Sequence, residues 1–116
     1  MSIGLHKVAL EQAERLIKAG EVATFDTNWE AEKPTKDEVL HFIDNHYMNE
    51  YGLWFLGADT NVPKDLKEHY VYPYGDLKVV QRCALVEAIK RAEKSGHADI
   101  LAAAKRLLEM IDKRGK

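Results

Sequence analysis

The side chains best suited to chemistry in this sequence lie in one aromatic and polar segment. The set comprises three tyrosines, one histidine, one carboxylate and two cations: His69, Tyr70, Tyr72, Tyr74, Asp76, Lys78 and Arg82. Tyrosine rings offer flat apolar faces with a hydroxyl at the tip, a combination that suits a binding surface. Lys78 and Arg82 are four residues apart, which predicts that they share one helical face and can grip a carboxylate or a phosphate. The segment is therefore the predicted ligand or partner site.

The same segment also has a structural interpretation that needs no ligand. Tyrosines beside a proline, here Pro73, often pin a long loop to a helical bundle. Gly75 and Asp76 can turn the chain and cap the next helix without contacting any ligand. At the level of sequence both interpretations stay open.

Other groups of reactive side chains argue against the common catalytic and metal chemistries. No two of the five histidines have the i, i+4 spacing with which one helix offers two imidazoles to zinc, so no metal is expected. The glycines are scattered instead of forming a phosphate-binding loop, and neither serine lies in a nucleophile elbow. Asp37 and His41 can orient one another on a helix, but such an exposed pair usually adds only a little stability. The sequence predicts no cofactor.

The lone cysteine and the apolar pattern bear on the compartment of the protein. Cys83 cannot form an internal disulfide, and we expect a small core residue of a helix there in preference to a reactive thiol. Glu11 and Glu14 interrupt the apolar run of a signal peptide, and the longest apolar stretch, residues 53–58, is too short to cross a bilayer. These features predict a cytoplasmic protein. The net charge of −2 makes nucleic acid and anionic membranes unexpected partners.

Helical periodicity dominates the elements that must position these side chains. Apolar residues recur every three or four positions over residues 8–17, and Gly20 then provides a left-handed cap, so we expect a first helix that ends just before it. Thr35 and Glu38 fit a reciprocal capping box, which predicts that a second helix begins at Lys36.

The middle of the chain is less regular. The apolar stripe of the second helix continues to Leu56, with a break or kink expected between residues 45 and 52. We expect residues 59–76 to form a loop with one helical turn at 64–69. Residues 70–72 resemble a strand, but a lone strand without a visible partner is marginal, so extended coil is the prediction.

Two long helices are expected at the end of the chain. Asp76 can cap a helix over residues 77–95 that closes at Gly96, and the last helix should cover residues 98–113. Because only two or three residues separate these helices, they must form an antiparallel hairpin. The expected fold is all-α, a single helical domain of residues 1–116 built as an irregular bundle of four to five helices.

Two short motifs stand in the middle of the chain. Residues 54–57 form a WxLG segment, and residues 70–82 fit the pattern Y-x-Y/F-P-Y/F-G-D-L/F-K-x-V-x-R. In this order, and followed by an alanine-rich hairpin, they resemble a group of small uncharacterised bacterial proteins. The likeness covers most of the chain from Thr35 onward. It implies one domain and brings no assigned activity.

The sequence favours a non-catalytic interaction or regulatory module, because it contains no close set of nucleophile, base and oxyanion donor. The alternative is a small ligand-binding protein or an enzyme that uses a polar cluster of His69, Tyr72, Tyr74, Asp76 and Arg82. Nucleic-acid binding is a third class, and acidic residues interspersed among the basic ones of the second half argue against it.

Charge is divided unevenly along the chain and bears on possible partners. Residues 1–58 hold five basic and ten acidic side chains, a net charge of −5, whereas residues 59–116 hold twelve and nine, a net charge of +3. Complementary halves can support head-to-tail docking, although chance produces similar divisions. The expected partner is another protein or a second copy in a homodimer.

Overall fold

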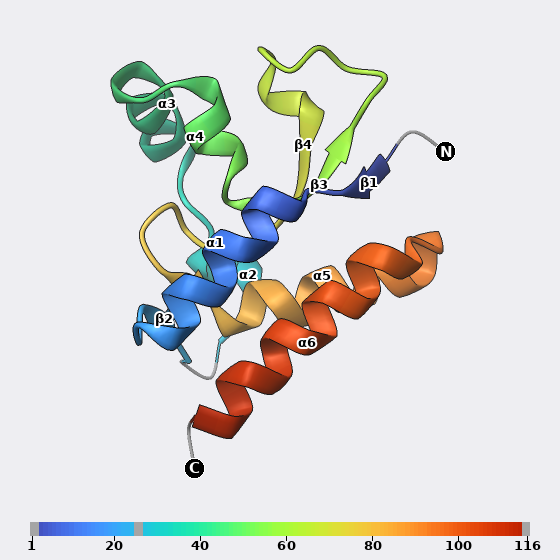
Figure 1. Cartoon of the computed structure of the whole chain (residues 1–116). Helices are drawn as coiled ribbons and strands as arrows, with labels where there is room; N and C mark the ends of the chain where they lie inside the picture. Colours follow the sequence, from blue (N-terminus) through green and yellow to red (C-terminus); the bar gives the residue numbers. More distant parts are fainter. Residues whose placement is uncertain (1–2, 25–26, 115–116) are drawn as a thin grey trace.

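The chain folds into a mixed α/β architecture, so the prediction of an all-α bundle is wrong (Figure 1). The computed structural model describes residues 3–24 and 27–114. Helices make up 59% of it and strands 15%. The helices are α1 (Lys7–Lys18), α2 (Trp29–Glu32), α3 (Lys36–Asn45), α4 (Met48–Gly52), α5 (Arg82–Ser95) and α6 (Ala98–Arg114), with a 3-10 turn, η1 (Lys67–His69). The strands are β1 (Ile3–Leu5), β2 (Val22–Ala23), β3 (Phe55–Asp59), β4 (Tyr70–Pro73) and β5 (Val80–Gln81).

Two small sheets explain the difference from the predicted fold. Strands β1, β3 and β4 form an antiparallel sheet in that order, and β2 pairs with β5 in parallel. The stretch predicted as extended coil is β4, which pairs with β3 through Gly57 opposite Val71. Gly57 lets the sheet approach α6 closely, because a Cβ atom there would lie 2.9 Å from the Cδ1 atom of Ile100. Phe55 and Leu56, which were predicted to end a helical apolar stripe, instead belong to strand β3, and β3 packs against α6.

Several predicted helix boundaries are confirmed. Helix α1 ends at Lys18, and Gly20 follows with φ +84°. The capping box of α3 is complete: the Glu38 N–H donates to Thr35 Oγ1 at 3.1 Å, and the Thr35 N–H donates to Glu38 Oε1 at 3.0 Å. The expected break falls between α3 and α4. Gly96, with φ +75°, closes α5 as predicted.

The predicted start of α5 at residue 77 is wrong, because the helix begins at Arg82. Leu77 has φ +72°, a left-handed backbone that no α-helix contains. Asp76 Oδ1 accepts the N–H groups of Lys78 and Val79 at 3.1 and 3.0 Å, which closes a local turn in place of a helix cap. The chain then passes through β5 before it enters the hairpin.

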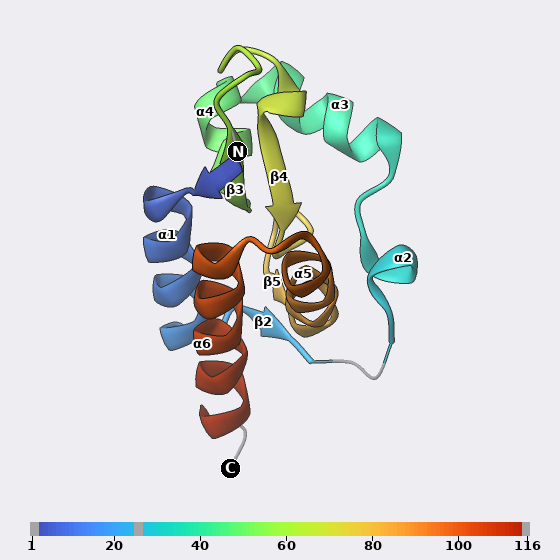
Figure 2. The same cartoon turned by 90° about the vertical axis from the view of Figure 1, so that its right-hand side faces the viewer.

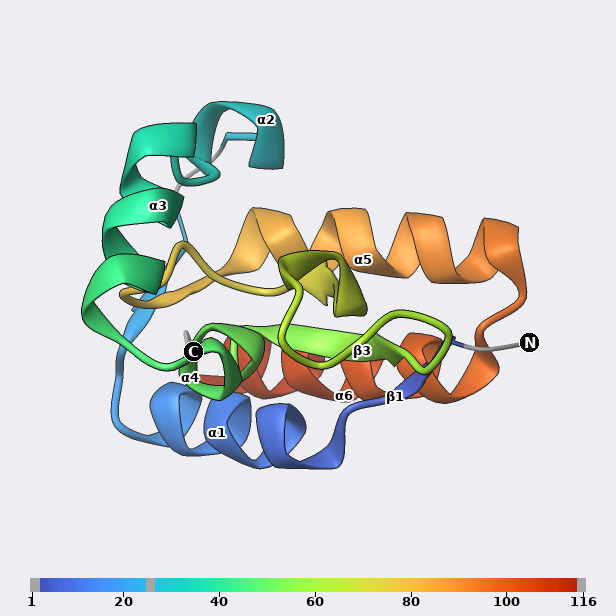
Figure 3. The ribbon, with the colours of Figure 1, turned by 90° about the horizontal axis from the view of Figure 1, so that it is seen from above.

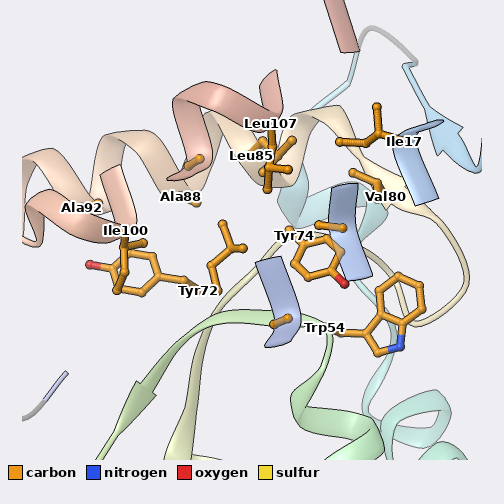
Figure 4. Close-up of a cluster of buried hydrophobic side chains, with 14 of the residues drawn as sticks. Ile17, Trp54, Tyr72, Tyr74, Val80, Leu85, Ala88, Ala92, Ile100 and Leu107 are labelled. Carbon is orange, nitrogen blue, oxygen red and sulfur yellow. The ribbon is translucent and has the colours of Figure 1, made fainter. Parts of the chain in front are cut away.

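The main core lies where α1, α5 and α6 meet the sheet residues (Figures 3 and 4). Helices α5 and α6 form the predicted antiparallel hairpin, and α1 lies along α6. Ala88 and Ala104 are buried, and their small side chains let the helix axes approach closely. The rings of Trp54 and Tyr74 stack within this core, with centroids 5.6 Å apart (Figure 4).

Helices α2 and α3 lie apart from this core. Figure 2 shows them on the side of α5 that faces away from α1 and α6. Trp29 anchors α2 in a second, smaller cluster with Cys83 and Ala84 at the start of α5. Among the helices of residues 3–24 and 27–114, none combines the length and the apolar character needed to span a bilayer.

Candidate functional site

The structure places the predicted site residues in three different environments. His69 is buried at the end of η1, and its Nδ1 lies 2.7 Å from the carbonyl oxygen of Val62. Tyr70 begins β4, packs its ring against His69, and donates its hydroxyl to the Lys64 carbonyl at 3.2 Å. Burial raises the pKa of Tyr70. These two side chains close the loop between β3 and β4.

Tyr72 and Tyr74 are core residues. The Tyr72 hydroxyl lies 2.6 Å from Nδ1 of the buried His97. The Tyr74 ring is fully buried, and its hydroxyl donates to the Leu53 carbonyl at 2.7 Å while it accepts from Gln12 at 3.0 Å. Burial strongly raises the pKa of Tyr74, so its hydroxyl stays protonated. Both hydroxyl groups form their hydrogen bonds inside the fold.

The charged members of the predicted site separate from one another. Lys78 precedes α5 and lies 3.7 Å from the Glu38 carboxylate of α3, so the prediction that it shares a helical face with Arg82 is wrong. Arg82 makes a bidentate ion pair with Asp112 of α6, with Nε and Nη2 at 2.9 and 3.3 Å from the two carboxylate oxygens. Asp76 Oδ2 accepts from the amide of Gln81 at 3.1 Å.

The predicted polar cluster is therefore not assembled around a shared space. Among the described residues, the only hydrogen bond, ion pair or ring contact between two of these seven side chains is the contact of His69 with Tyr70. The hydroxyl and carboxylate groups at positions 72, 74 and 76 hold β4, the following turn and β5 against the helices. The assignment of this segment as a binding site stays a prediction.

A cleft beside the hairpin is a stronger candidate, and Arg82 belongs to it. This hairpin cleft has a volume of about 560 Å³ and lies between the β2–α2 connection, α5 and the end of α6. Its lining includes Asn28, Trp29, Arg82, Cys83, Lys90 and Asp112. The volume lies within the range of clefts that hold small molecules.

The floor of the hairpin cleft is apolar and contains the only cysteine of the chain. Cys83 and Trp29 are buried together against Ala84. Burial, and to a smaller extent the nearby Glu32 carboxylate, raise the pKa of the Cys83 thiol. A thiol with a raised pKa stays protonated at neutral pH and is a poor nucleophile. The expectation of a core cysteine is confirmed.

The walls of the hairpin cleft carry both paired and unpaired polar groups. Arg82 is neutralised by Asp112, and Glu87 is held by Arg91 at 3.1 Å. By contrast, the Lys90 ammonium has no hydrogen-bond or ion-pair partner among residues 3–24 and 27–114. The hydroxyls of Thr24 and Thr27 and the side-chain NH₂ of Asn28 also have no partner there; the Asn28 carbonyl accepts the N–H of Ala31 at 3.0 Å. These unpaired groups can donate hydrogen bonds to an anionic or carbonyl-bearing ligand.

No spacing in the sequence points to this cleft, because its two walls are more than fifty residues apart. Trp29 is a large aromatic residue in a polar segment without clear periodicity, and the structure buries it. In the part of the chain that the structure describes, no three His, Cys, Asp or Glu side chains come together as a metal site.

No family model, curated protein or solved structure matches the chain. The resemblance of residues 54–57 and 70–82 to small bacterial proteins thus stays a prediction, and function has to be argued from the geometry of the hairpin cleft.

Proposed function

We propose that this chain is a non-catalytic binding module that holds a small molecule with one anionic group in the hairpin cleft. The observation that carries the proposal is the unpartnered Lys90 ammonium in the wall of a cleft with an apolar floor. A cation beside apolar surface can recognise a carboxylate through charge while the rest of the ligand excludes water. A cytoplasmic location is part of the same proposal, since a lone protonated thiol suits a reducing compartment.

Binding is favoured over nucleophilic catalysis by the state of the groups that line the cleft. A nucleophile needs an adjacent base or a lowered pKa, and the Cys83 thiol has a raised pKa. Glu87, the carboxylate of α5 that lines the cleft, is already paired with Arg91. These features support recognition without a covalent step.

Amide chemical shifts in a two-dimensional NMR titration with benzoate and with inorganic phosphate test the proposal. We expect benzoate to shift the amides of Asn28, Trp29 and Lys90, and Lys90→Met to weaken binding about tenfold or more through loss of a charged hydrogen bond. Lys94→Met is the matched control, because Lys94 is exposed on the same helix and lies outside the cleft lining.

The titration also gives outcomes that contradict the proposal. It is wrong if neither probe shifts amides around the cleft, or if Lys90→Met binds as tightly as Lys94→Met. Shifts confined to the segment around Tyr70 and Asp76 would instead support the polar cluster predicted from the sequence.

A further inference from the structure

A small pocket beside Trp29 is distinct from the hairpin cleft. This aromatic pocket has a volume of about 160 Å³, and Trp29 is the only described residue that lines both cavities. Its walls come from α2, α3, α4, β3 and β4, together with the α2–α3 connection and the turn between β4 and β5. The proposed function makes no use of this pocket.

Most of the wall of the aromatic pocket consists of rings. Trp29, Tyr51 and Phe55 contribute aromatic rings, and Pro34 and Pro73 contribute saturated ones. Trp29 and Tyr51 are buried, whereas Phe55 and both prolines are only half-buried. Part of this apolar wall is therefore still in contact with water, and an apolar ligand that covers it would gain free energy by releasing that water.

The pocket offers no unpaired charge to a ligand. Among the described residues that line it, Lys33 is the only charged one, and its ammonium pairs with Glu30 at 2.8 Å. The other polar side-chain groups in the wall are the Tyr51 hydroxyl and the indole N–H of Trp29, both of them neutral. An ionised ligand would lose its hydration there without meeting a free charge of opposite sign. The ligand should therefore be uncharged.

The size of the pocket corresponds to a single ring. A cavity of about 150 Å³ lined by apolar side chains stays dry and holds a benzene molecule. The aromatic pocket is of similar volume. Three aromatic walls favour an aromatic ligand, because such rings attract one another in edge-to-face and offset arrangements.

The turn between β4 and β5 contributes a strained residue to the pocket. Leu77 lines it with φ +72°, an unfavourable conformation for a leucine. Residues held in such conformations cluster at ligand-binding sites. The contact of Lys78 with Glu38 at 3.7 Å ties the same turn to α3, whose Val39 also lines the pocket. Two walls of the pocket are thus connected to each other.

We propose that the aromatic pocket binds a small uncharged aromatic molecule, a single benzene ring with at most a short apolar substituent. The side chains of Trp29, Tyr51 and Phe55 contact the ring, while the prolines and Leu77 exclude water from it. The site does not depend on the proposed function, since Lys90 is absent from the lining of the aromatic pocket.

A two-dimensional NMR titration with toluene tests this site. Toluene should shift the amides of Val39, Phe55 and Leu77 and leave that of Lys90 unchanged. Benzoate carries a charge on the same ring and should bind in this pocket at least about tenfold more weakly. Val39→Phe places a ring in the pocket and should weaken toluene binding about tenfold or more. Val8→Phe is the matched control, because Val8 is 53% exposed on α1 and lies outside the lining.

A second variant separates filling of the pocket from damage to the fold. Val39→Ala removes side-chain volume from the same wall and should still bind toluene. The proposal is wrong if toluene leaves the three amides unshifted, if Val39→Phe binds toluene as tightly as Val8→Phe, or if Val39→Ala loses binding as Val39→Phe does. Benzoate that binds in this pocket as tightly as toluene would also contradict it. A failure of benzoate at Lys90 contradicts the proposed function alone, and a failure of toluene contradicts this site alone.

Discussion

The Tyr72 hydroxyl and Nδ1 of His97 lie 2.6 Å apart in the interior, and this bond joins strand β4 to the turn between α5 and α6. Their rings meet edge to face, with centroids 5.6 Å apart. Tyr72 also has φ +64°, an unfavourable backbone conformation for a tyrosine. Such a conformation persists only where surrounding contacts compensate for it. The bond to His97 is one of those contacts.

Removing that hydroxyl should destabilise the whole fold. In Tyr72→Phe the ring stays, but the buried Nδ1 of His97 loses its hydrogen-bond partner, and the free energy of unfolding should fall by about 1–3 kcal/mol. Urea unfolding followed by circular dichroism measures this change. Tyr47→Phe is the control, since Tyr47 is 79% exposed and its substitution should change stability by less than about 0.5 kcal/mol. Equal effects of the two substitutions would contradict a structural role for the bond.

Gly75 and Gly96 should respond differently to the same substitution. A Cβ atom at Gly75 would lie 2.8 Å from two carbons of the Trp54 ring and would press on the carbonyl oxygen of Val79. Gly96 has open space around it but φ +75°. Gly75→Ala should therefore cost about 1–3 kcal/mol through overpacking, and Gly96→Ala about 1–2 kcal/mol through backbone strain.

Asparagine at the same two positions distinguishes overpacking from backbone strain. Asparagine tolerates the left-handed conformation, so Gly96→Asn should recover part of the stability that Gly96→Ala loses. Gly75→Asn should be at least as damaging as Gly75→Ala, because the larger side chain meets the same ring and carbonyl. Melting temperatures of the four variants provide the measurement. A Gly75→Asn variant more stable than Gly75→Ala would show that the space around Gly75 can hold a side chain.

Whether a sequence-based prediction is right or wrong depends on how far apart in the sequence the interacting residues lie. Helix α1, the capping box of α3 and the α5–α6 hairpin depend on apolar periodicity and caps within one segment, and all were predicted. The sheets depend on pairings between distant residues, such as Leu5 with Gly57 and Val22 with Val80. Strands β1, β2 and β5 have only two or three residues, which is too short to show an alternating pattern. The sequence therefore does not indicate which segments pair with them.

The site was harder to predict than the fold for a related reason. Arg82 was recognised as a candidate, but its partner Asp112 lies thirty residues away on another helix. The tyrosines were recognised as a group, but alternation along β4 and the following turn sends Tyr72 and Tyr74 into the core. An aromatic and polar segment in a sequence does not distinguish hydroxyls that face a ligand from hydroxyls that hold two elements together.

The capping box of α3 should act locally. Thr35→Ala removes the acceptor for the Glu38 N–H and should cost the helix about 1 kcal/mol. Because α3 has no buried residue, this loss should appear as faster hydrogen exchange of the α3 amides, with little change in global stability. Thr27→Ala is the control, since its hydroxyl caps no helix in the described ranges. A fall in global stability equal to the local loss would show that α3 unfolds only with the core.

Cys83 should react as a buried, protonated thiol. Its raised pKa means that the folded chain holds the proton more tightly than the unfolded chain does. The stabilising contribution of the thiol is therefore complete below the unfolded pKa and is lost as the pH rises through the higher folded pKa. Labelling with a disulfide reagent as a function of pH should give a higher midpoint in native protein than in urea-unfolded protein, because the thiolate is the reacting form. Equal midpoints would mean that Cys83 is solvated in the native state, and the apolar floor of the hairpin cleft would then be wrongly assigned.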